Sequence, residues 1–85
     1  MSNKLETLKK RLLYRATYRG TKEMDILLGQ FVKKYIDEFD EIYLNELENF
    51  LKFEDEIIFN FYQHNIIKEN IDQNKVSKIF KNFKI

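Results

Sequence analysis

Apolar residues recur every three or four positions along almost the whole chain, the spacing that places them on one face of an α-helix. The sequence has no proline and only two glycines among its 85 residues, so few positions force a helix to break. No stretch alternates polar and apolar residues for long enough to indicate a strand. We therefore expect an all-α protein, a compact bundle of five short helices with an aromatic-rich core.

Turns and one polar loop divide this apolar pattern into its five helices. Gly20 can adopt the left-handed conformation that ends the first helix, and Thr21 is placed to cap the second. Asp40 and Asp55 are expected to cap the third and fourth helices. Residues 65–72 form the loop before the fifth helix, and their three isoleucines predict that it packs down. The expected apolar faces are, in chain order, Leu5, Leu8, Leu12 and Ala16; Met24, Leu27, Leu28, Phe31, Val32 and Tyr35; Tyr43, Leu44, Leu47, Phe50 and Leu51; Ile58, Phe59, Phe61 and Tyr62; and Val76, Ile79, Phe80 and Phe83.

The length and the reactive side chains limit what the chain can do. Residues 1–85 are expected to form a single helical domain, because the length suits one domain and no Ser/Gly-rich linker interrupts it. The absence of cysteine excludes disulfides and thiolate sites, and the lone His64 excludes a His-rich metal site. The acidic pairs are adjacent residues, whose side chains do not face each other on a helix. We therefore expect no catalytic residues, no stably bound cofactor, no metal ion and no enzymatic activity.

The apolar runs and the N-terminal segment bear on where the protein resides. No apolar run approaches the length that crosses a bilayer, and residues 1–6 lack the apolar core of a secretory signal. The first helix is basic and amphipathic, as in a mitochondrial transit peptide, but Glu6 comes early and the most informative motif begins too soon to leave a removable leader. The sequence therefore predicts a cytoplasmic protein without membrane insertion, and we expect it to be a monomer.

The net charge of +1 conceals a strong segregation of charge along the chain. Residues 1–22 carry seven basic side chains and one acidic one, residues 23–56 carry three basic and eleven acidic, and residues 57–85 carry five basic and two acidic. Such asymmetry favours oriented docking on a partner with a complementary field. The simpler interpretation is that the basic and acidic helices lie side by side and partly neutralise each other.

The basic N-terminal segment also raises the question of nucleic-acid binding. Tyr14 and Tyr18 are interleaved with lysines and arginines, a combination that can grip phosphates and stack bases. The acidic segment that follows and the nearly neutral total charge argue against it. We rank this function third and expect no nucleic-acid partner.

The junction between the first two helices carries the most specific signal of the chain. Arg19, Gly20 and Glu23 have an architectural explanation, because capping and helix-dipole rules place a cation at a helix end, a glycine at its stop and an acid in the next first turn. Alternatively, these residues and Asp25 form a recognition surface. The short pattern alone leaves both interpretations open.

Further motifs extend from this junction in both directions. The chain reads Arg11-Leu12-Leu13-Tyr14-Arg15-Ala16, then Arg19-Gly20-x-x-Glu23-x-Asp25, Leu27-Leu28-Gly29-x-Phe31, Leu47-Glu48-x-Phe50-Leu51, Glu54-Asp55 and Ile58-Phe59-Asn60-Phe61. In this order and spacing, residues 5–64 resemble the succinate dehydrogenase assembly factor 2 family, known in bacteria as the FAD assembly factor SdhE. The family often has a basic residue in place of Tyr18, proline in place of Glu56 and tryptophan in place of Phe61.

The resemblance implies a five-helix protein that is not itself an enzyme. Such factors bind the flavoprotein subunit of succinate dehydrogenase, and related fumarate reductase subunits in some bacteria. They promote covalent attachment of FAD to a histidine of that subunit, so FAD would be the cofactor of the partner. On this resemblance we expect the partner-binding residues to be Arg19, Gly20, Glu23 and Asp25, extended by Arg11, Tyr14 and Arg15.

A different protein-interaction role is the leading alternative. A small helical antitoxin or inhibitor would show the same charge segregation and helical composition, and it would bind a toxin or an enzyme. The two interpretations differ in one measurable respect, because an antitoxin or inhibitor would leave the FAD content of a flavoprotein unchanged.

Overall fold

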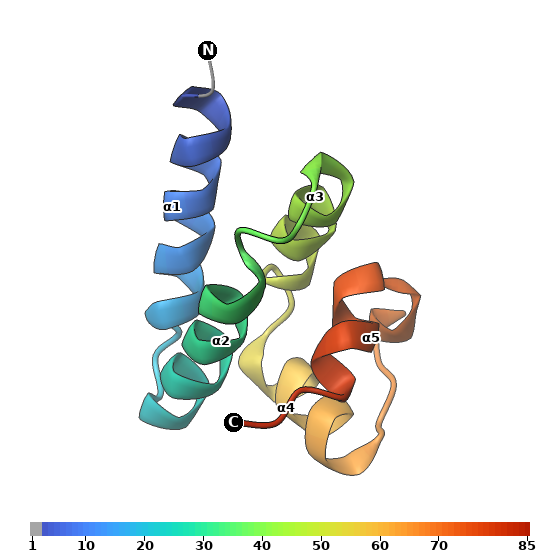
Figure 1. The fold of residues 1–85 in the computed structure, drawn as a ribbon. Coiled ribbons are helices and arrows are strands. Elements are labelled where there is room, and N and C mark those ends of the chain that lie inside the picture. Colours follow the sequence, from blue (N-terminus) through green and yellow to red (C-terminus); the bar gives the residue numbers. More distant parts are fainter. Residues whose placement is uncertain (1–2) are drawn as a thin grey trace.

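The computed structural model describes residues 3–85, and helices account for the regular structure in this range (Figure 1). The prediction of an all-α bundle of five short helices is confirmed, and no strand occurs among the described residues. The helices are α1 (Asn3–Thr17), α2 (Lys22–Tyr35), α3 (Glu41–Phe50), α4 (Asp55–His64) and α5 (Lys75–Lys81), with the 3-10 turn η1 (Ile71–Gln73) before α5.

The helices form two halves. α1 and α2 lie side by side as a hairpin joined by a short turn at residues 18–21 (Figure 1). α3 contacts both α1 and α5, and α4 and η1 pack on α5. The molecule is elongated, 42 × 26 × 20 Å, and the N-terminal end of α1 projects beyond the other helices at the top of Figure 1. This projection explains why Leu5, expected on a buried face, has 39% of its surface exposed.

Aromatic rings form the centre of the core. Phe31 of α2 is fully buried, and its ring centroid lies 5.1 Å from that of Phe80 and 5.3 Å from that of Phe83. Phe50 of α3 completes the cluster, with its ring centroid 5.3 Å from that of Phe80. Because these rings come from both halves of the molecule, burying them together holds the two halves in one fold.

The helix starts follow the capping predictions in two cases out of three. The Thr21 hydroxyl accepts a hydrogen bond from the Met24 N–H at 3.3 Å, and Asp40 Oδ1 accepts one from the Tyr43 N–H at 2.9 Å. The prediction that Asp55 caps α4 is wrong, because Glu54 precedes the first helical residue and makes no side-chain cap. Asp55 lies inside the first turn of α4, and its carboxylate binds an arginine of another segment instead.

The loop at residues 65–72 packs against the core through only one of its three isoleucines. Ile71 is fully buried, whereas Ile66 and Ile67 are 41% and 56% exposed. Asn65 and Asn70 have φ angles of 57° and 59°, a left-handed conformation that asparagine adopts more readily than most residues. Glu69 also has a positive φ, of 53°, so three residues of this loop adopt the left-handed conformation.

Asn74 links α5 to α3 from a nearly buried position. Its Oδ1 accepts hydrogen bonds from the backbone N–H groups of Val76 and Ser77, at 2.8 and 2.9 Å. Its Nδ2 donates to the carbonyl oxygen of Glu46 on α3, at 2.9 Å. One side chain therefore caps α5 and places its first turn against α3.

Replacing Asn74 by alanine is expected to lower the free energy of unfolding by about 1–3 kcal/mol, because two N–H groups and one carbonyl lose their partner. Urea unfolding followed by circular dichroism measures this change. Asn45→Ala is the matched control, since Asn45 is exposed on α3 and its removal should change stability by less than about 0.5 kcal/mol. Equal stability of the two variants would contradict the proposed role of Asn74.

Candidate functional site

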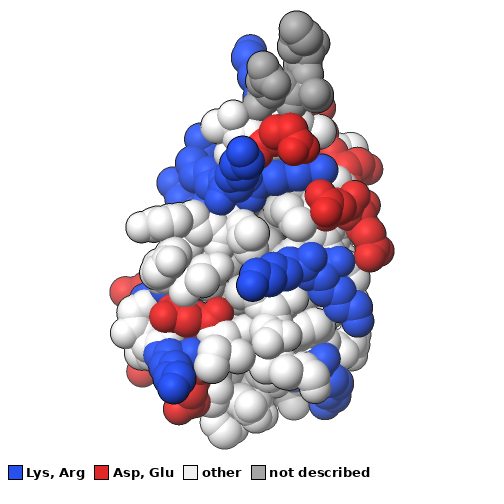
Figure 2. Space-filling view, turned by 60° about the vertical axis from the view of Figure 1, so that its left-hand side comes forward, with Lys and Arg blue, Asp and Glu red and all other residues white. Residues whose placement is uncertain are grey.

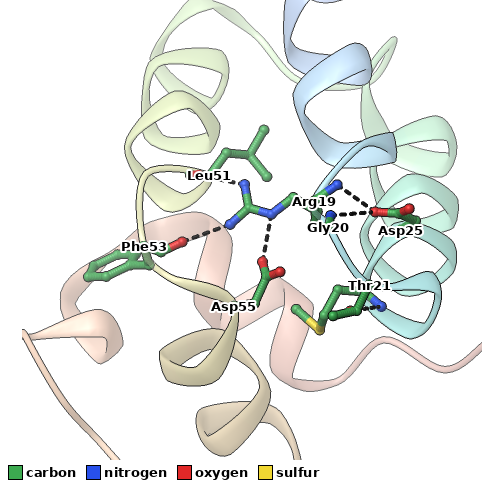
Figure 3. Close-up of polar contacts among 8 residues, drawn as sticks. Arg19, Gly20, Thr21, Asp25, Leu51, Phe53 and Asp55 are labelled. Carbon is green, nitrogen blue, oxygen red and sulfur yellow. Dashed lines mark hydrogen bonds and ion pairs between the residues drawn. The ribbon is translucent and has the colours of Figure 1, made fainter.

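The turn between α1 and α2 is held in one conformation by two features. Gly20 has a φ of 118°, a value that L-residues with a side chain rarely adopt. Asp25, in the first turn of α2, accepts hydrogen bonds at Oδ1 from the backbone N–H groups of Arg19, at 2.5 Å, and Gly20, at 3.3 Å (Figure 3). The Asp25 carboxylate therefore serves the turn itself and fixes the direction in which α2 leaves it.

The Arg19 side chain connects this turn to the segment between α3 and α4. Its Nε donates to Asp55 Oδ1 at 2.8 Å, and its two terminal nitrogens donate to the carbonyl oxygens of Leu51 and Phe53, each at 2.7 Å (Figure 3). Only 11% of the Arg19 side chain is exposed. The guanidinium group is thus directed into the protein, where it bridges two segments more than thirty residues apart in sequence.

Two tyrosines stand on the solvent side of the same turn. Tyr14 and Tyr18 are 65% and 66% exposed, and their ring centroids are 4.5 Å apart. The two tyrosines line an open hollow of about 440 Å³. Its other lining residues are Arg15 of α1, Arg19 of the turn, and Glu54 and Asp55 where α4 begins. Tyrosine and arginine are enriched at the energetic centres of protein interfaces.

Glu23 borders a second, smaller hollow that adjoins the first. This hollow measures about 250 Å³, and it is lined by Thr21, Glu23, Met24, Asp55, Glu56 and Phe59. Asp55 borders both hollows, so the predicted residues Tyr14, Arg15 and Glu23 lie on one continuous face around the turn. We call this surface, formed by Tyr14, Arg15, Tyr18, Gly20, Glu23 and Glu54, the junction face.

Arg11 lies apart from the junction face. Its terminal nitrogen is 3.5 Å from Glu48 Oε2 on α3, and it lines a different hollow, between α1 and α3, with Lys4 and Asn45 among its neighbours. The structure therefore brings six of the seven predicted residues together around the turn. Arg11 lies one helical turn before Arg15, toward the N-terminus of α1. The assignment of all seven to partner binding stays a prediction.

Basic side chains of α1 form ion pairs with the acidic segment at residues 23–56. Lys9 of α1 pairs with Asp37 at 3.4 Å, and Arg11 pairs with Glu48, so the basic helix partly neutralises the acidic segment. Figure 2 shows basic side chains beside the N-terminal end of the chain and further basic and acidic groups, separated by uncharged areas, on the face below them. The simpler interpretation of the charge pattern thus holds for the two ion pairs.

Sequence reasoning did not assign a role to Tyr18, Glu54 or Asp55 in the site. Tyr18 follows Tyr14 at the i+4 spacing that makes side chains neighbours on a helix, so this signal was available. No local pattern identifies Asp55 as the partner of Arg19, because 36 residues separate them. Among residues 3–85, no group of three or more His, Cys, Asp or Glu residues could hold a metal ion, and no helix could span a membrane.

Replacing Arg19 by alanine is expected to lower the free energy of unfolding by about 2–4 kcal/mol, because two carbonyls and a carboxylate lose charge-assisted bonds together. The measurement is urea unfolding followed by circular dichroism. Arg15→Ala serves as the control, since Arg15 is exposed and should change stability by less than about 0.5 kcal/mol. An Arg19→Ala protein as stable as the control would show that these bonds contribute little.

Known proteins similar to this chain support one family. Residues 10–84 match the family described as flavinator of succinate dehydrogenase. The chain is 37% identical over 78 residues to the mitochondrial succinate dehydrogenase assembly factor 2 of Scheffersomyces stipitis, which covers 91% of this chain and 52% of that protein. It is 41% identical over 51 residues to the FAD assembly factor SdhE of Acetobacter pasteurianus, which covers 60% of this chain and 47% of that protein.

A relative from Drosophila mojavensis, a mitochondrial succinate dehydrogenase assembly factor 2-A, is 56% identical over 36 residues, or 42% of this chain and 23% of that protein. The aligned part of the chain thus spans about half the length of the Scheffersomyces and Acetobacter relatives. No solved structure matches significantly. Because the family match extends from α1 to the residues after α5, the chain belongs to the family of succinate dehydrogenase flavinators.

Proposed function

We propose that this protein is an assembly factor that binds the flavoprotein subunit of succinate dehydrogenase and promotes the covalent attachment of FAD to it. Membership of the flavinator family is the observation that carries the proposal. The names of the Scheffersomyces and Acetobacter relatives, an assembly factor of succinate dehydrogenase and an FAD assembly factor, support it. The flavoprotein of fumarate reductase is a second proposed partner. The alternative of an antitoxin or inhibitor has no support from any of these similarities.

The junction face is the surface that we propose for docking. It presents two neighbouring, exposed tyrosines beside Arg15, and tyrosine and arginine are among the residue types that most often dominate binding energy. Because the turn is braced from inside, these side chains would lose little backbone entropy on binding. Glu23 and the backbone of Gly20 complete the contact, and Arg11 extends it along α1.

Arg19 and Asp25 contribute to the proposed interface through the shape of the turn. The guanidinium group of Arg19 already satisfies three acceptors inside the protein, and Asp25 Oδ1 already accepts two backbone hydrogen bonds. Their replacement would displace Tyr18 and Gly20 relative to the start of α4. Loss of docking in such variants would therefore follow from a deformed junction face.

The proposed mechanism leaves the chemistry to the partner. Binding would hold the immature flavoprotein in a conformation in which its histidine and its flavin are aligned, so that attachment proceeds from a pre-oriented complex. We assign FAD to the partner, because the family that the chain matches is described as the flavinator of succinate dehydrogenase, and the bound flavin then belongs to that flavoprotein. The chain itself is proposed to act as a monomer without catalytic activity, and its residence in the cytoplasm stays a prediction.

Co-producing the flavoprotein subunit with this protein should raise its covalent flavin, measured as in-gel fluorescence after denaturation. Replacing Tyr14 and Tyr18 together by alanine should lower this signal by at least about five-fold, because the exposed aromatic anchors are removed. Ile42→Ala is the matched control, since Ile42 is also a large, 60% exposed apolar residue but lies on α3. Arg19→Ala should lower the signal as well, at a temperature where circular dichroism shows it folded.

Equal covalent flavin with the protein, without it and with each folded variant would overturn the proposed function for this partner. A rise in flavin that the tyrosine pair does not affect would leave the function in place and move the docking surface away from the junction face.

Substitutions at Gly20 can distinguish two effects, backbone strain within the protein and a clash with the partner. The Cβ of an L-residue at position 20 would meet no atom within 4 Å apart from those of its two chain neighbours, so its main cost within the protein comes from the φ of 118°. L-alanine at this position should lower the free energy of unfolding by about 1–2 kcal/mol, whereas D-alanine, for which a positive φ is favourable, should not lower it. Thermal unfolding of the two synthetic proteins measures this difference.

If the partner approaches the backbone of Gly20 closely, the D-alanine protein should still lose flavin-attachment activity despite its full stability. Full activity of that protein would show that Gly20 serves the turn and leaves room at the interface.

A further inference from the structure

A row of aromatic side chains emerges from the core at the end of α2 that is remote from the junction face. Phe31, Tyr35, Phe39 and Tyr43 follow one another every four residues, and successive ring centroids are 5.1, 5.7 and 5.5 Å apart. Phe31 is fully buried, but the other three rings are only partly buried. The row therefore leads from the core to the surface, where its last three rings pack against the core on one side and are partly exposed on the other.

These three rings line a hollow of about 330 Å³, which we call the aromatic hollow. Its lining consists of Tyr35, Glu38, Phe39, Asp40, Tyr43 and Ile79. The volume is close to the lower limit of about 300 Å³ for small-ligand sites, which is enough for one side chain of a partner. Tyr35 and Phe39 are nearly parallel, at an interplanar angle of 14°, so they present similarly oriented ring faces.

The charge around the aromatic hollow has one sign. Both charged residues in its lining, Glu38 and Asp40, are acidic, and no lysine or arginine contributes to it. Asp40 Oδ1 accepts the Tyr43 N–H, while the nearest described ion pair of the acidic segment, between Asp37 and Lys9, involves residues outside the lining. A cation that entered the hollow would therefore meet aromatic rings and carboxylates, and no basic residue belongs to the lining itself.

The same aromatic surface already attracts a cation within the protein. Lys34 Nζ lies 5.6 Å from the centroid of the Tyr35 ring and 5.8 Å from that of Phe83, within the range of cation–π attraction. Lys34 is not part of the lining of the aromatic hollow. This contact, made by the neighbouring residue in the sequence, shows that the ring of Tyr35 takes part in a cation–π interaction.

We propose that the aromatic hollow binds the guanidinium group of an arginine side chain presented by a protein partner. Arginine fits better than lysine, because its planar group can lie against the rings while its forked N–H donors reach a carboxylate. The 14 residues of α2 place this site roughly 20 Å from the junction face. The site rests on its own geometry and does not require the proposed flavoprotein function.

The test is an NMR titration of the full-length protein with three capped pentapeptides, in which arginine, lysine or citrulline is flanked by glycines. The arginine peptide should shift the ring resonances of Tyr35, Phe39 and Tyr43, and it should bind at least about three-fold more tightly than the lysine peptide. The citrulline peptide, which keeps the shape but not the charge, should leave these resonances unchanged. Equal shifts with citrulline or with lysine would overturn the proposal.

Two variants that each remove one acidic charge distinguish binding at a defined site from general electrostatic attraction of the peptide. Glu38→Gln should weaken binding of the arginine peptide about three-fold, whereas Glu41→Gln, which removes the same charge just outside the lining, should leave it unchanged. Phe39→Leu should weaken it at least about five-fold while the helical circular dichroism is retained. Equal weakening by the two acidic variants would indicate general electrostatic attraction and would overturn the proposal.

The basic α1 of a second copy of the chain is the competing occupant. If it fills the hollow, the ring resonances of Tyr35, Phe39 and Tyr43 should shift with protein concentration in the absence of peptide. Such a shift would overturn the assignment to a different partner, and concentration-independent spectra would support it.

Discussion

The Arg19 guanidinium group is the interaction on which the junction depends. It joins the turn between the first two helices to the carbonyl oxygens of Leu51 and Phe53, in the connection between α3 and α4, and to the carboxylate of Asp55 at the start of α4. Only arginine carries a planar fork of donors that reaches three acceptors in different directions while remaining charged. The turn and the start of α4 therefore hold a fixed relative position.

This bracing changes how the most specific sequence motif is understood. The side chains of Arg19 and Asp25 bind groups of the protein itself. The exposed residues beside them are Tyr18, Gly20 and Glu23. An architectural role and the proposed recognition role are thus compatible at this junction. The internal residues create a rigid turn, and the rigid turn presents the exposed ones.

The charge pattern has a similar double character. Pairing between α1 and the acidic segment neutralises part of both, as the contacts of Lys9 and Arg11 demonstrate. The acidic and aromatic residues near Phe39 have no basic residue in the lining of their hollow. The two ends of α2 therefore offer surfaces of different chemistry, a tyrosine-rich face at its start and an acidic aromatic hollow at its end.

The sequence by itself determined the helical class, the helix order, most of the core and the caps Thr21 and Asp40, because apolar periodicity and capping depend on residues close together in the chain. The motifs also led to the correct family. Tertiary structure alone decided that Asp55 binds Arg19 instead of capping α4, that Leu5 lies beyond the packed part of α1, and that Tyr18 borders the junction hollow. These features depend on which segments, distant in sequence, come into contact. The packing of the two halves decides those contacts, and local sequence patterns do not encode it.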